Sequence, residues 1–262
     1  MAVRLLLDPG GTRLKFACVQ GGEVQSVDHV QWHELSATGD KKWTPPAPWS
    51  DGAFADVHML KRSTPPNAPE NWLATFLSAF GMNAMECRTL DPLARSGLEI
   101  AYPHGKPGSD RIAAALACHR KNPKGRFVII DAGTCITIDL LDANRWKGGA
   151  IMPGIQLQAA SMRQAGLPEI QPDAAMLWNV PTGPVGALGN STEEAIRAGI
   201  PWAVRHAVKA VAEALMTFAP KARVILTGGD AQHFEGLGGW QTFADPNLVM
   251  RGGALLLNES TS

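Results

Sequence analysis

Two segments of the chain repeat one device: an apolar strand, then Asp-x-Gly, then a hydroxyl residue, then a second strand. The first is LLLDPGGTRLKFACV at residues 5–19, and the second is VIIDAGTCITIDLL at residues 128–141. Tight turns between strands favour Asp and Gly, so one copy alone would carry little information. Two copies, each opening a similar series of elements, predict an internal duplication with two related lobes.

The elements expected around the two copies follow the same order, three strands and then strands alternating with helices. Strands are expected over residues 4–8, 14–19, 24–32, 57–60 and 84–90, and again over 127–130, 137–141, 148–152 and 223–226. Helices are expected over residues 70–80, around Met162, over 192–218, and at the end of the chain after Gly252 and Gly253. Ser191 and Glu194 are spaced as a capping box for the long helix. The proline-rich residues 43–51 predict a surface loop.

Composition narrows the kind of partner. The 262 residues are 45% apolar, and 24 basic residues balance 24 acidic ones without a run of either sign. This balance argues against nucleic acid and against an anionic membrane surface. The four cysteines lack C-x-x-C spacing, which is typical of reduced core thiols, and the leucines before Asp8 are too few for a signal peptide. We therefore expect a cytoplasmic protein that acts on a small molecule.

The glycines of the two turns are suited to binding phosphate. Glycine has no Cβ, so backbone N–H groups can come close to phosphate oxygens. Gly10, Gly11 and Gly133 meet this need, and Thr12 and Thr134 add hydroxyl donors. The two hairpins are expected to face each other across one nucleotide, with Gly228 and Gly229 under its adenosine. The segment assigned to ATP in the first lobe is Asp8, Pro9, Gly10, Gly11, Thr12, Arg13, Leu14 and Lys15, although Lys15 could equally point to solvent.

The aspartates beside these glycines imply bound cations. Asp8 and Asp131 would repel phosphate unless a cation lay between the carboxylate and the phosphate oxygens. For Asp8 we expect the Mg²⁺ that accompanies ATP. The pattern therefore predicts a nucleotide site with metal ions rather than a metal-free phosphate cradle.

Four motifs make a family resemblance specific. They are Gly108-Ser109-Asp110-Arg111, Asp131-Ala132-Gly133-Thr134, GGAIMPG at residues 148–154, and Thr227-Gly228-Gly229. In order and spacing they resemble the motifs of type III pantothenate kinases, members of the superfamily of actin, sugar kinases and heat-shock chaperones. The resemblance covers nearly the whole chain. It implies an α/β fold of two duplicated ribonuclease-H-like (actin-like ATPase) lobes, residues 1–115 and 116–262, each a mixed sheet flanked by helices, with the ATP cleft between them.

The resemblance also implies a reaction, the ATP-dependent phosphorylation of pantothenate to 4'-phosphopantothenate in coenzyme A biosynthesis, by a homodimer. Asp110 would be the general base for the pantothenate hydroxyl, and Arg111 would face the negative charge of this acid. Tyr102, Gly108, Ser109 and Thr192 would complete the pantothenate site. Asp131 would hold a monovalent cation, K⁺ or NH₄⁺.

Each of these roles has a structural alternative. Asp110 could cap the helix that follows it, and Arg111 could be a solvated helix residue. Tyr102 could be a packed loop aromatic, and Thr192 could cap the long helix, a role open to Ser191 as well. Asp131 could be a simple turn residue, but its counterpart Asp8 argues for a ligand.

One residue of the first loop departs from the family pattern. The family has D-x-G-N followed by Thr or Ser, whereas this chain has Gly11 at the asparagine position. A side-chain hydrogen bond is lost, and the loop gains backbone freedom. This departure favours one alternative, a non-catalytic accessory protein of the same fold. A sugar kinase is the other, although further sugar-reading motifs are not found, and neither zinc-ligand spacing nor a Ser-His-Asp arrangement is legible.

Overall fold

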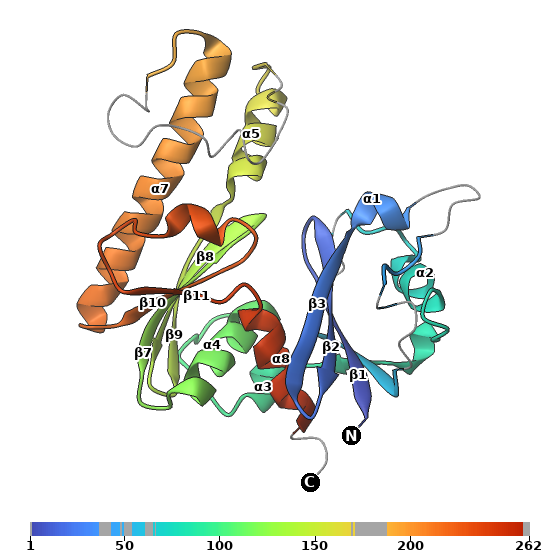
Figure 1. The fold of residues 1–262 in the computed structure, drawn as a ribbon. Helices are drawn as coiled ribbons and strands as arrows, with labels where there is room; N and C mark the ends of the chain where they lie inside the picture. Colours follow the sequence, from blue (N-terminus) through green and yellow to red (C-terminus); the bar gives the residue numbers. More distant parts are fainter. Residues whose placement is uncertain are drawn as a thin grey trace. The chain divides into compact units, whose positions relative to one another are not determined.

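The structure is a computed structural model that describes residues 2–36, 43–47, 49, 54–60, 65, 67–168, 170 and 188–258. The chain forms two compact units, one of Met1–Lys121 with Asn247–Ser262 and the other of Asn122–Pro246. The second unit is therefore inserted into the first between helices α4 (Ser109–Lys121) and α8 (Leu248–Asn258) (Figure 1).

A five-stranded mixed sheet forms the centre of the first unit, in the order β3-β2-β1-β4-β5. Strands β3, β2 and β1 are antiparallel neighbours, whereas β1, β4 and β5 run parallel. The strands of this sheet are β1 (Val3–Pro9), β2 (Arg13–Gln20), β3 (Glu23–Gln31), β4 (Asp56–Leu60) and β5 (Cys87–Leu90), and the short strand β6 (Glu99–Ile100) is not one of them. The remaining helices are α1 (Trp32–Leu35), α2 (Trp72–Ser78), α3 (Pro92–Arg95) and the 3₁₀ turn Ala84–Glu86.

The second unit repeats this topology. Five strands of its six-stranded sheet lie in the order β9-β8-β7-β10-β11, with β9, β8 and β7 antiparallel and β7, β10 and β11 parallel. Numbered from the start of each unit, five strands of each sheet therefore follow the order 3-2-1-4-5, which confirms the duplicated α/β fold. The elements are β7 (Arg126–Ala132), β8 (Cys135–Asp142), β9 (Arg145–Pro153), α5 (Ile155–Gln164), α7 (Thr192–Phe218), β10 (Arg223–Thr227), the 3₁₀ turn Ala231–Phe234 and β11 (Thr242–Ala244).

The proline-rich segment contributes to the core of the first unit. Trp49 is 6% exposed, and its ring meets Phe16 edge-on with centroids 4.7 Å apart. Trp43 stacks on Phe76 of α2 at 5.1 Å. The expectation of a surface loop is therefore wrong for these two tryptophans. Prolines disfavour a long helix or a central strand in this segment but do not prevent burial, because the aromatic rings fill the space beside the sheet.

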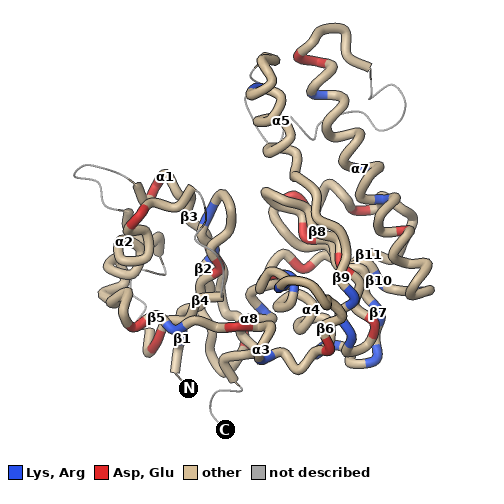
Figure 2. The backbone as a smooth tube through the Cα atoms, turned by 180° about the vertical axis from the view of Figure 1, so that it is seen from behind, with Lys and Arg blue, Asp and Glu red and all other residues tan. Residues whose placement is uncertain are grey.

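Charges of both signs are interspersed along the backbone of each unit (Figure 2). An example is Asp142, which pairs with Arg126 at 3.1 Å and with Lys147 at 2.9 Å. These partners lower the pKa of Asp142, first through the hydrogen bond from Lys147. In the part of the chain that the structure describes, no helix combines the length and the apolar character needed to cross a membrane.

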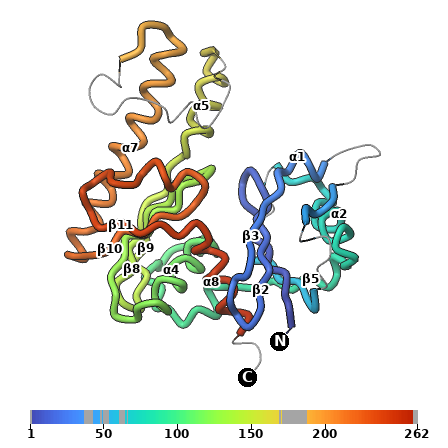
Figure 3. The backbone as a smooth tube through the Cα atoms, viewed as in Figure 1, coloured from blue at the N-terminus to red at the C-terminus, as the bar shows by residue number. Residues whose placement is uncertain are grey.

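The last helix, α8, packs in the first unit. It lies beside the strands β1, β2 and β3, where Figure 3 shows the red end of the chain next to its blue beginning. Gly252 and Gly253 lie inside this helix, so the prediction that they precede it is wrong. A Cβ on Gly252 would lie 1.9 Å from the carbonyl oxygen of Ala113, so glycine allows α8 to approach α4. The proposed division into lobes at residues 1–115 and 116–262 stays a prediction, while these contacts group α8 with residues 1–121.

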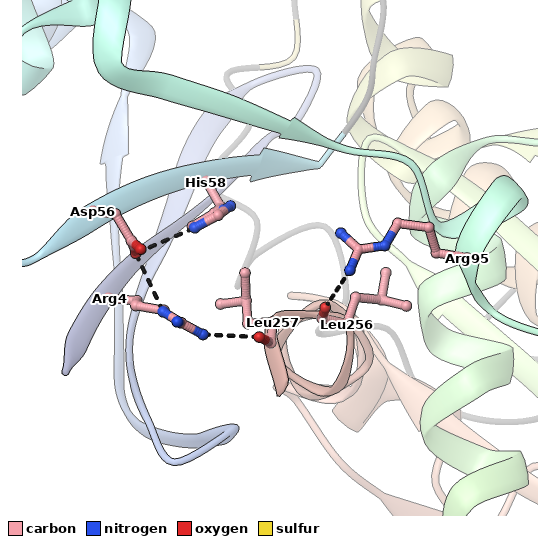
Figure 4. Close-up of polar contacts among 6 residues, drawn as sticks. All are labelled: Arg4, Asp56, His58, Arg95, Leu256 and Leu257. Atoms are coloured by element: carbon pink, nitrogen blue, oxygen red, sulfur yellow. Dashed lines mark hydrogen bonds and ion pairs between the residues drawn. The ribbon is translucent and has the colours of Figure 1, made fainter. Parts of the chain in front are cut away.

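Two arginines hold the C-terminal end of α8 (Figure 4). Arg4 Nη1 donates to the carbonyl oxygen of Leu257 at 2.8 Å, and Arg95 Nη2 donates to that of Leu256 at 3.0 Å. Such carbonyls have no partner within the helix, and a positive charge there is favourable with the helix dipole. Arg4 also pairs with Asp56 at 3.4 Å, and Asp56 Oδ1 lies 3.2 Å from Nε2 of the buried His58.

Candidate active site

The first candidate loop connects β1 to β2 through Gly10, Gly11 and Thr12. The N–H of Gly10 donates to the carbonyl oxygen of Arg13 at 2.9 Å, and a Cβ on Gly10 would lie 2.9 Å from that same oxygen. Glycine therefore permits this tight turn. Asp8, just before the loop, is buried with 5% of its surface exposed.

The strand register decides where Lys15 lies. In the β1–β2 ladder Asp8 is directly opposite Lys15. Residues directly opposite each other in an antiparallel pair project from the same face of the sheet. Lys15 is therefore on the face of Asp8, beside the loop, rather than on the opposite face where Leu14 and Phe16 join the core.

Two side chains bind the carbonyl oxygens of this loop, and neither was expected from the sequence. Trp32 Nε1 donates to the carbonyl oxygen of Gly10 at 3.0 Å. Asn67 Nδ2 donates to that of Gly11 at 3.2 Å. Both residues come from segments far along the chain, so no local sequence pattern indicated these contacts.

The second candidate loop connects β7 to β8 through Gly133 and Thr134. The N–H of Gly133 donates to the carbonyl oxygen of Cys135 at 3.1 Å, and the N–H of Gly154 donates to that of Thr134 at 2.9 Å. A Cβ on Gly154 would lie 2.2 Å from the carbonyl oxygen of Gly133. Only glycine at the end of the GGAIMPG motif allows this contact, and this role was not expected from the sequence.

The end of β10 lies against the same loop. Thr227 pairs with Asp131 in the parallel β10–β7 ladder. Gly228 has a φ of 92°, and a Cβ added at this position would lie 2.2 Å from the carbonyl oxygen of Ala132 and 2.5 Å from Asp131 Oδ1. The N–H of Asp230 donates to the Ala132 carbonyl oxygen at 3.0 Å. Three sequence motifs of the second unit, 131–134, 148–154 and 227–229, thus meet at one end of its sheet.

The G-x-D-R motif forms the start of α4. The helix begins at Ser109, so Asp110 lies in its first turn and not at the N-cap position expected under the alternative role. Asp110 Oδ1 accepts from the N–H of Arg111 at 2.9 Å, and a Cβ on Gly108 would lie 2.5 Å from the same oxygen. Arg111 is only 6% exposed, which excludes the alternative of a solvated helix arginine.

The other two predicted acceptor residues lie in different surroundings. Tyr102 is 40% exposed, in the irregular segment before α4. Thr192 is the exposed first residue of α7. The cap of α7 is Ser191, whose side chain accepts from the N–H of Glu194 at 3.1 Å, so the capping role falls to Ser191 as expected. Glu194 completes the arrangement through the N–H of Asn190 at 2.9 Å rather than through Ser191.

The aspartates beside the glycine loops are suited to a metal ion that is also bound by the phosphates of the nucleotide. Among the described residues, no group of three or more His, Cys, Asp or Glu side chains could hold a metal ion. Mg²⁺ in phosphate-transfer sites is usually bound by one or two carboxylates together with substrate phosphates and water. Asp8, a single buried carboxylate next to a glycine loop, fits this mode of binding.

Comparison with known sequences gives a consistent result over the whole chain. The family model for type III pantothenate kinase matches residues 4–214. A type III pantothenate kinase from Alkalilimnicola ehrlichii is 31% identical over 265 residues, an alignment that covers 98% of this chain and 98% of the relative. One from Phocaeicola vulgatus is 34% identical over 253 residues, covering 95% and 96%.

Solved structures show the same fold at low identity. A conserved Baf family protein from Campylobacter jejuni aligns with a TM-score of 0.56 and 18% identity over 98% of both chains. The activator of 2-hydroxyisocaproyl-CoA dehydratase from Clostridium difficile, solved with ADPNP bound, aligns with a TM-score of 0.51 and 11% identity, covering 98% of this chain and 95% of its own. At such identities the likeness concerns the fold alone.

Proposed function

The chain belongs to the type III pantothenate kinase family, and from this premise we propose which of its residues carry out the transfer. Kinases of this family phosphorylate pantothenate to 4'-phosphopantothenate in coenzyme A biosynthesis. The observation that carries the assignment is the family match over residues 4–214, within which the G-x-D-R motif begins helix α4.

We assign the phosphate contacts of ATP to the two glycine loops. The first is the segment Asp8, Pro9, Gly10, Gly11, Thr12, Arg13, Leu14 and Lys15, and the second is Gly133 with Thr134. Backbone N–H groups in such turns form concave sites for anions, and hydroxyl groups add donors. The position of Lys15 on the face of Asp8 supports a role for its ammonium group in neutralising phosphate charge. Gly228 and Gly229 are assigned to the adenosine side of the nucleotide.

We assign the cations to the two loop aspartates, Mg²⁺ to Asp8 and a monovalent ion, K⁺ or NH₄⁺, to Asp131. Asp8 and Asp131 would hold these cations, whose positive charge would neutralise the charge that builds on the phosphoryl oxygens during transfer. Asp131 belongs to the cluster of glycine motifs at the end of β7, next to Gly228, which supports its place beside the nucleotide.

Asp110 is proposed as the general base. Its carboxylate, partly exposed in the first turn of α4, would accept the proton of the pantothenate primary hydroxyl as that oxygen attacks the γ-phosphate. Arg111, buried beside it, would balance the negative charge of the acid substrate. Tyr102, Gly108, Ser109 and Thr192 are proposed to complete the acceptor site. Because the transition state of phosphoryl transfer is loose, the base contributes less than positioning and cations.

We propose a cytoplasmic homodimer. The scattered cysteines, which the structure does not join in disulfides, support a reducing compartment. Apolar side chains exposed on α5 and α7, Leu157 and Trp202 among them, support an interface with a second copy. Light scattering of the purified protein would measure the oligomeric state directly.

One assay tests the function as a whole. ATP consumption by the purified protein is measured with pantothenate, with a panel of sugars, and with no acceptor. Stimulation by pantothenate alone is expected. Stimulation by a sugar instead would indicate a sugar kinase, and no acceptor-dependent turnover would indicate an accessory protein.

A further inference from the structure

We propose that Trp32 and Asn67 are positioning residues of the first phosphate loop, which substitute for the restraint missing at Gly11. The inference rests on the proposed role of this loop in binding ATP. It concerns the backbone conformation that the loop offers to the phosphates.

The two contacts reach successive peptide groups of the loop. Trp32 Nε1 donates to the carbonyl oxygen of Gly10 at 3.0 Å, and Asn67 Nδ2 donates to that of Gly11 at 3.2 Å. Trp32 is 3% exposed and begins α1, where its ring meets Trp72 edge-on at 5.2 Å. Because the indole ring is packed in place, its N–H donor is rigid and holds the carbonyl oxygen of Gly10 in a fixed position.

Fixing a carbonyl oxygen also fixes the N–H group of the next residue. In a trans peptide the C=O of one residue and the N–H of the following residue point in opposite directions. Trp32 thereby turns the N–H of Gly11 away from α1, and Asn67 turns the N–H of Thr12 away from its own side. Two N–H groups of the loop are thus oriented by groups that need not touch the nucleotide.

The second hairpin achieves the same restraint by other means. Gly11 and Thr134 each stand three residues after the loop aspartate, Asp8 or Asp131. The carbonyl oxygen of Thr134 is held by the backbone N–H of Gly154 at 2.9 Å, whereas that of Gly11 is held by the Asn67 side chain. The same position is thus restrained in both lobes, by a backbone donor in one and by a side-chain donor in the other.

The first loop needs this restraint because two adjacent glycines have wide conformational freedom. Ordering such residues costs entropy, and a loop ordered only by ATP would take that cost from the binding free energy. The hydrogen bonds from Trp32 and Asn67 order the loop before ATP binds. The entropy cost is then part of folding and does not reduce the binding free energy of ATP, which is the general advantage of preorganisation.

The test compares the dissociation constant of ATP, measured by calorimetry without pantothenate, in Asn67→Ala and Trp32→Phe. Phenylalanine keeps an aromatic ring next to Trp72 but removes the indole donor. Each variant is expected to weaken ATP binding by about 2- to 10-fold, the usual worth of one hydrogen bond, while the KM for pantothenate stays unchanged. Because Asn67 is exposed, its variant should keep the thermal midpoint of the wild type.

Asn258→Ala is a matched control. Asn258 Nδ2 donates to the carbonyl oxygen of Gly21 at 2.9 Å, so it makes the same kind of contact at the turn between β2 and β3. Its removal should leave ATP affinity unchanged. If Asn67→Ala and Trp32→Phe bind ATP as tightly as Asn258→Ala does, the positioning role is overturned while the proposed kinase function still stands. A wild-type protein that does not bind ATP would overturn the proposed function and this inference together.

Discussion

At the scale of single residues, the absence of one Cβ decides whether two motifs can meet. Gly228 fits against the carbonyl oxygen of Ala132 and the carboxylate of Asp131, with a positive φ of 92°. Gly236 also has a positive φ, 68°, but a Cβ there would meet nothing within 4 Å. A comparison of Gly228 with Gly236 therefore separates the energetic cost of backbone strain from that of a steric clash.

Replacing each of these two glycines by alanine is expected to lower stability by different amounts. Gly236→Ala should lower the free energy of unfolding by roughly 1 kcal/mol, the cost of a left-handed conformation for a residue with a Cβ. Gly228→Ala should lose about 2 kcal/mol or more and should weaken ATP binding, because the β10 end must move away from the second loop. Chemical denaturation and calorimetry measure the two effects. Equal losses in both variants would contradict the close packing of Gly228.

Asp110→Asn separates catalysis from helix stability. Asparagine keeps the size and a side-chain oxygen in the first turn of α4, so the fold and ATP binding should persist. If Asp110 is the base, kcat should fall by ~10²–10⁴ while the dissociation constant of ATP changes little. Steady-state kinetics with pantothenate decides the matter, and an undiminished kcat would leave Asp110 a purely structural residue.

Residues within motifs were predictable from the sequence, but residues that support them from outside were not. Asp8 and Asp131 follow apolar residues and precede glycines, so the sequence predicts their positions at the ends of strands. Trp32 and Asn67 contact the first loop only because the folded chain brings α1 and Asn67 beside it. Such contacts depend on tertiary structure and leave no local signal.

At the scale of elements, the C-terminal end of α8 is linked through Arg4 and Asp56 to the buried His58. Burial lowers the pKa of His58, while the carboxylate of Asp56 opposes this shift and the cations Arg4 and Arg88 add to it. The unfolded chain therefore takes up a proton at higher pH than the folded protein does. His58 contributes stability above its unfolded pKa of about 6.5, and that stability is lost as the pH falls below this value.

We expect the free energy of unfolding to fall between pH 7 and pH 5, and to fall less in His58→Gln. Denaturation at several pH values measures the difference. The exposed His33 offers a control, since His33→Gln should follow the wild type. Some dependence should remain in every variant, because burial also lowers the pKa of His29 and of His233. An identical pH profile for His58→Gln and wild type would contradict the role of His58.

Elements were predicted best where local signals agreed with packing. The helix over residues 192–218 has a cap at Ser191 and a regular apolar stripe, and α7 has those bounds. In α8 the local signal was misleading, since Gly252 and Gly253 weaken a helix in isolation. The approach of α4 outweighs that preference. The short α1 was missed because Trp32 continues the apolar pattern of β3.

At the scale of the whole molecule, the duplicated topology places one loop aspartate in each unit. We expect turnover to require Mg²⁺ together with K⁺ or NH₄⁺, since Asp8 and Asp131 put carboxylates beside both phosphate loops. Initial rates in K⁺, NH₄⁺ and Na⁺ buffers measure the monovalent requirement, and chelation of Mg²⁺ should abolish activity. Full activity in a buffer with Na⁺ alone would refute the assignment to Asp131.

The insertion of the second unit into the first also has a consequence for biosynthesis. Helix α8 covers the face of the first sheet that carries Leu6 and Leu60, yet the ribosome makes it only after all of residues 122–246. At ~5–20 residues per second, the nascent first unit waits on the order of ten seconds for its missing helix. Until then an apolar sheet face is open to chaperones and to other nascent chains, so the second unit is the first that can finish folding.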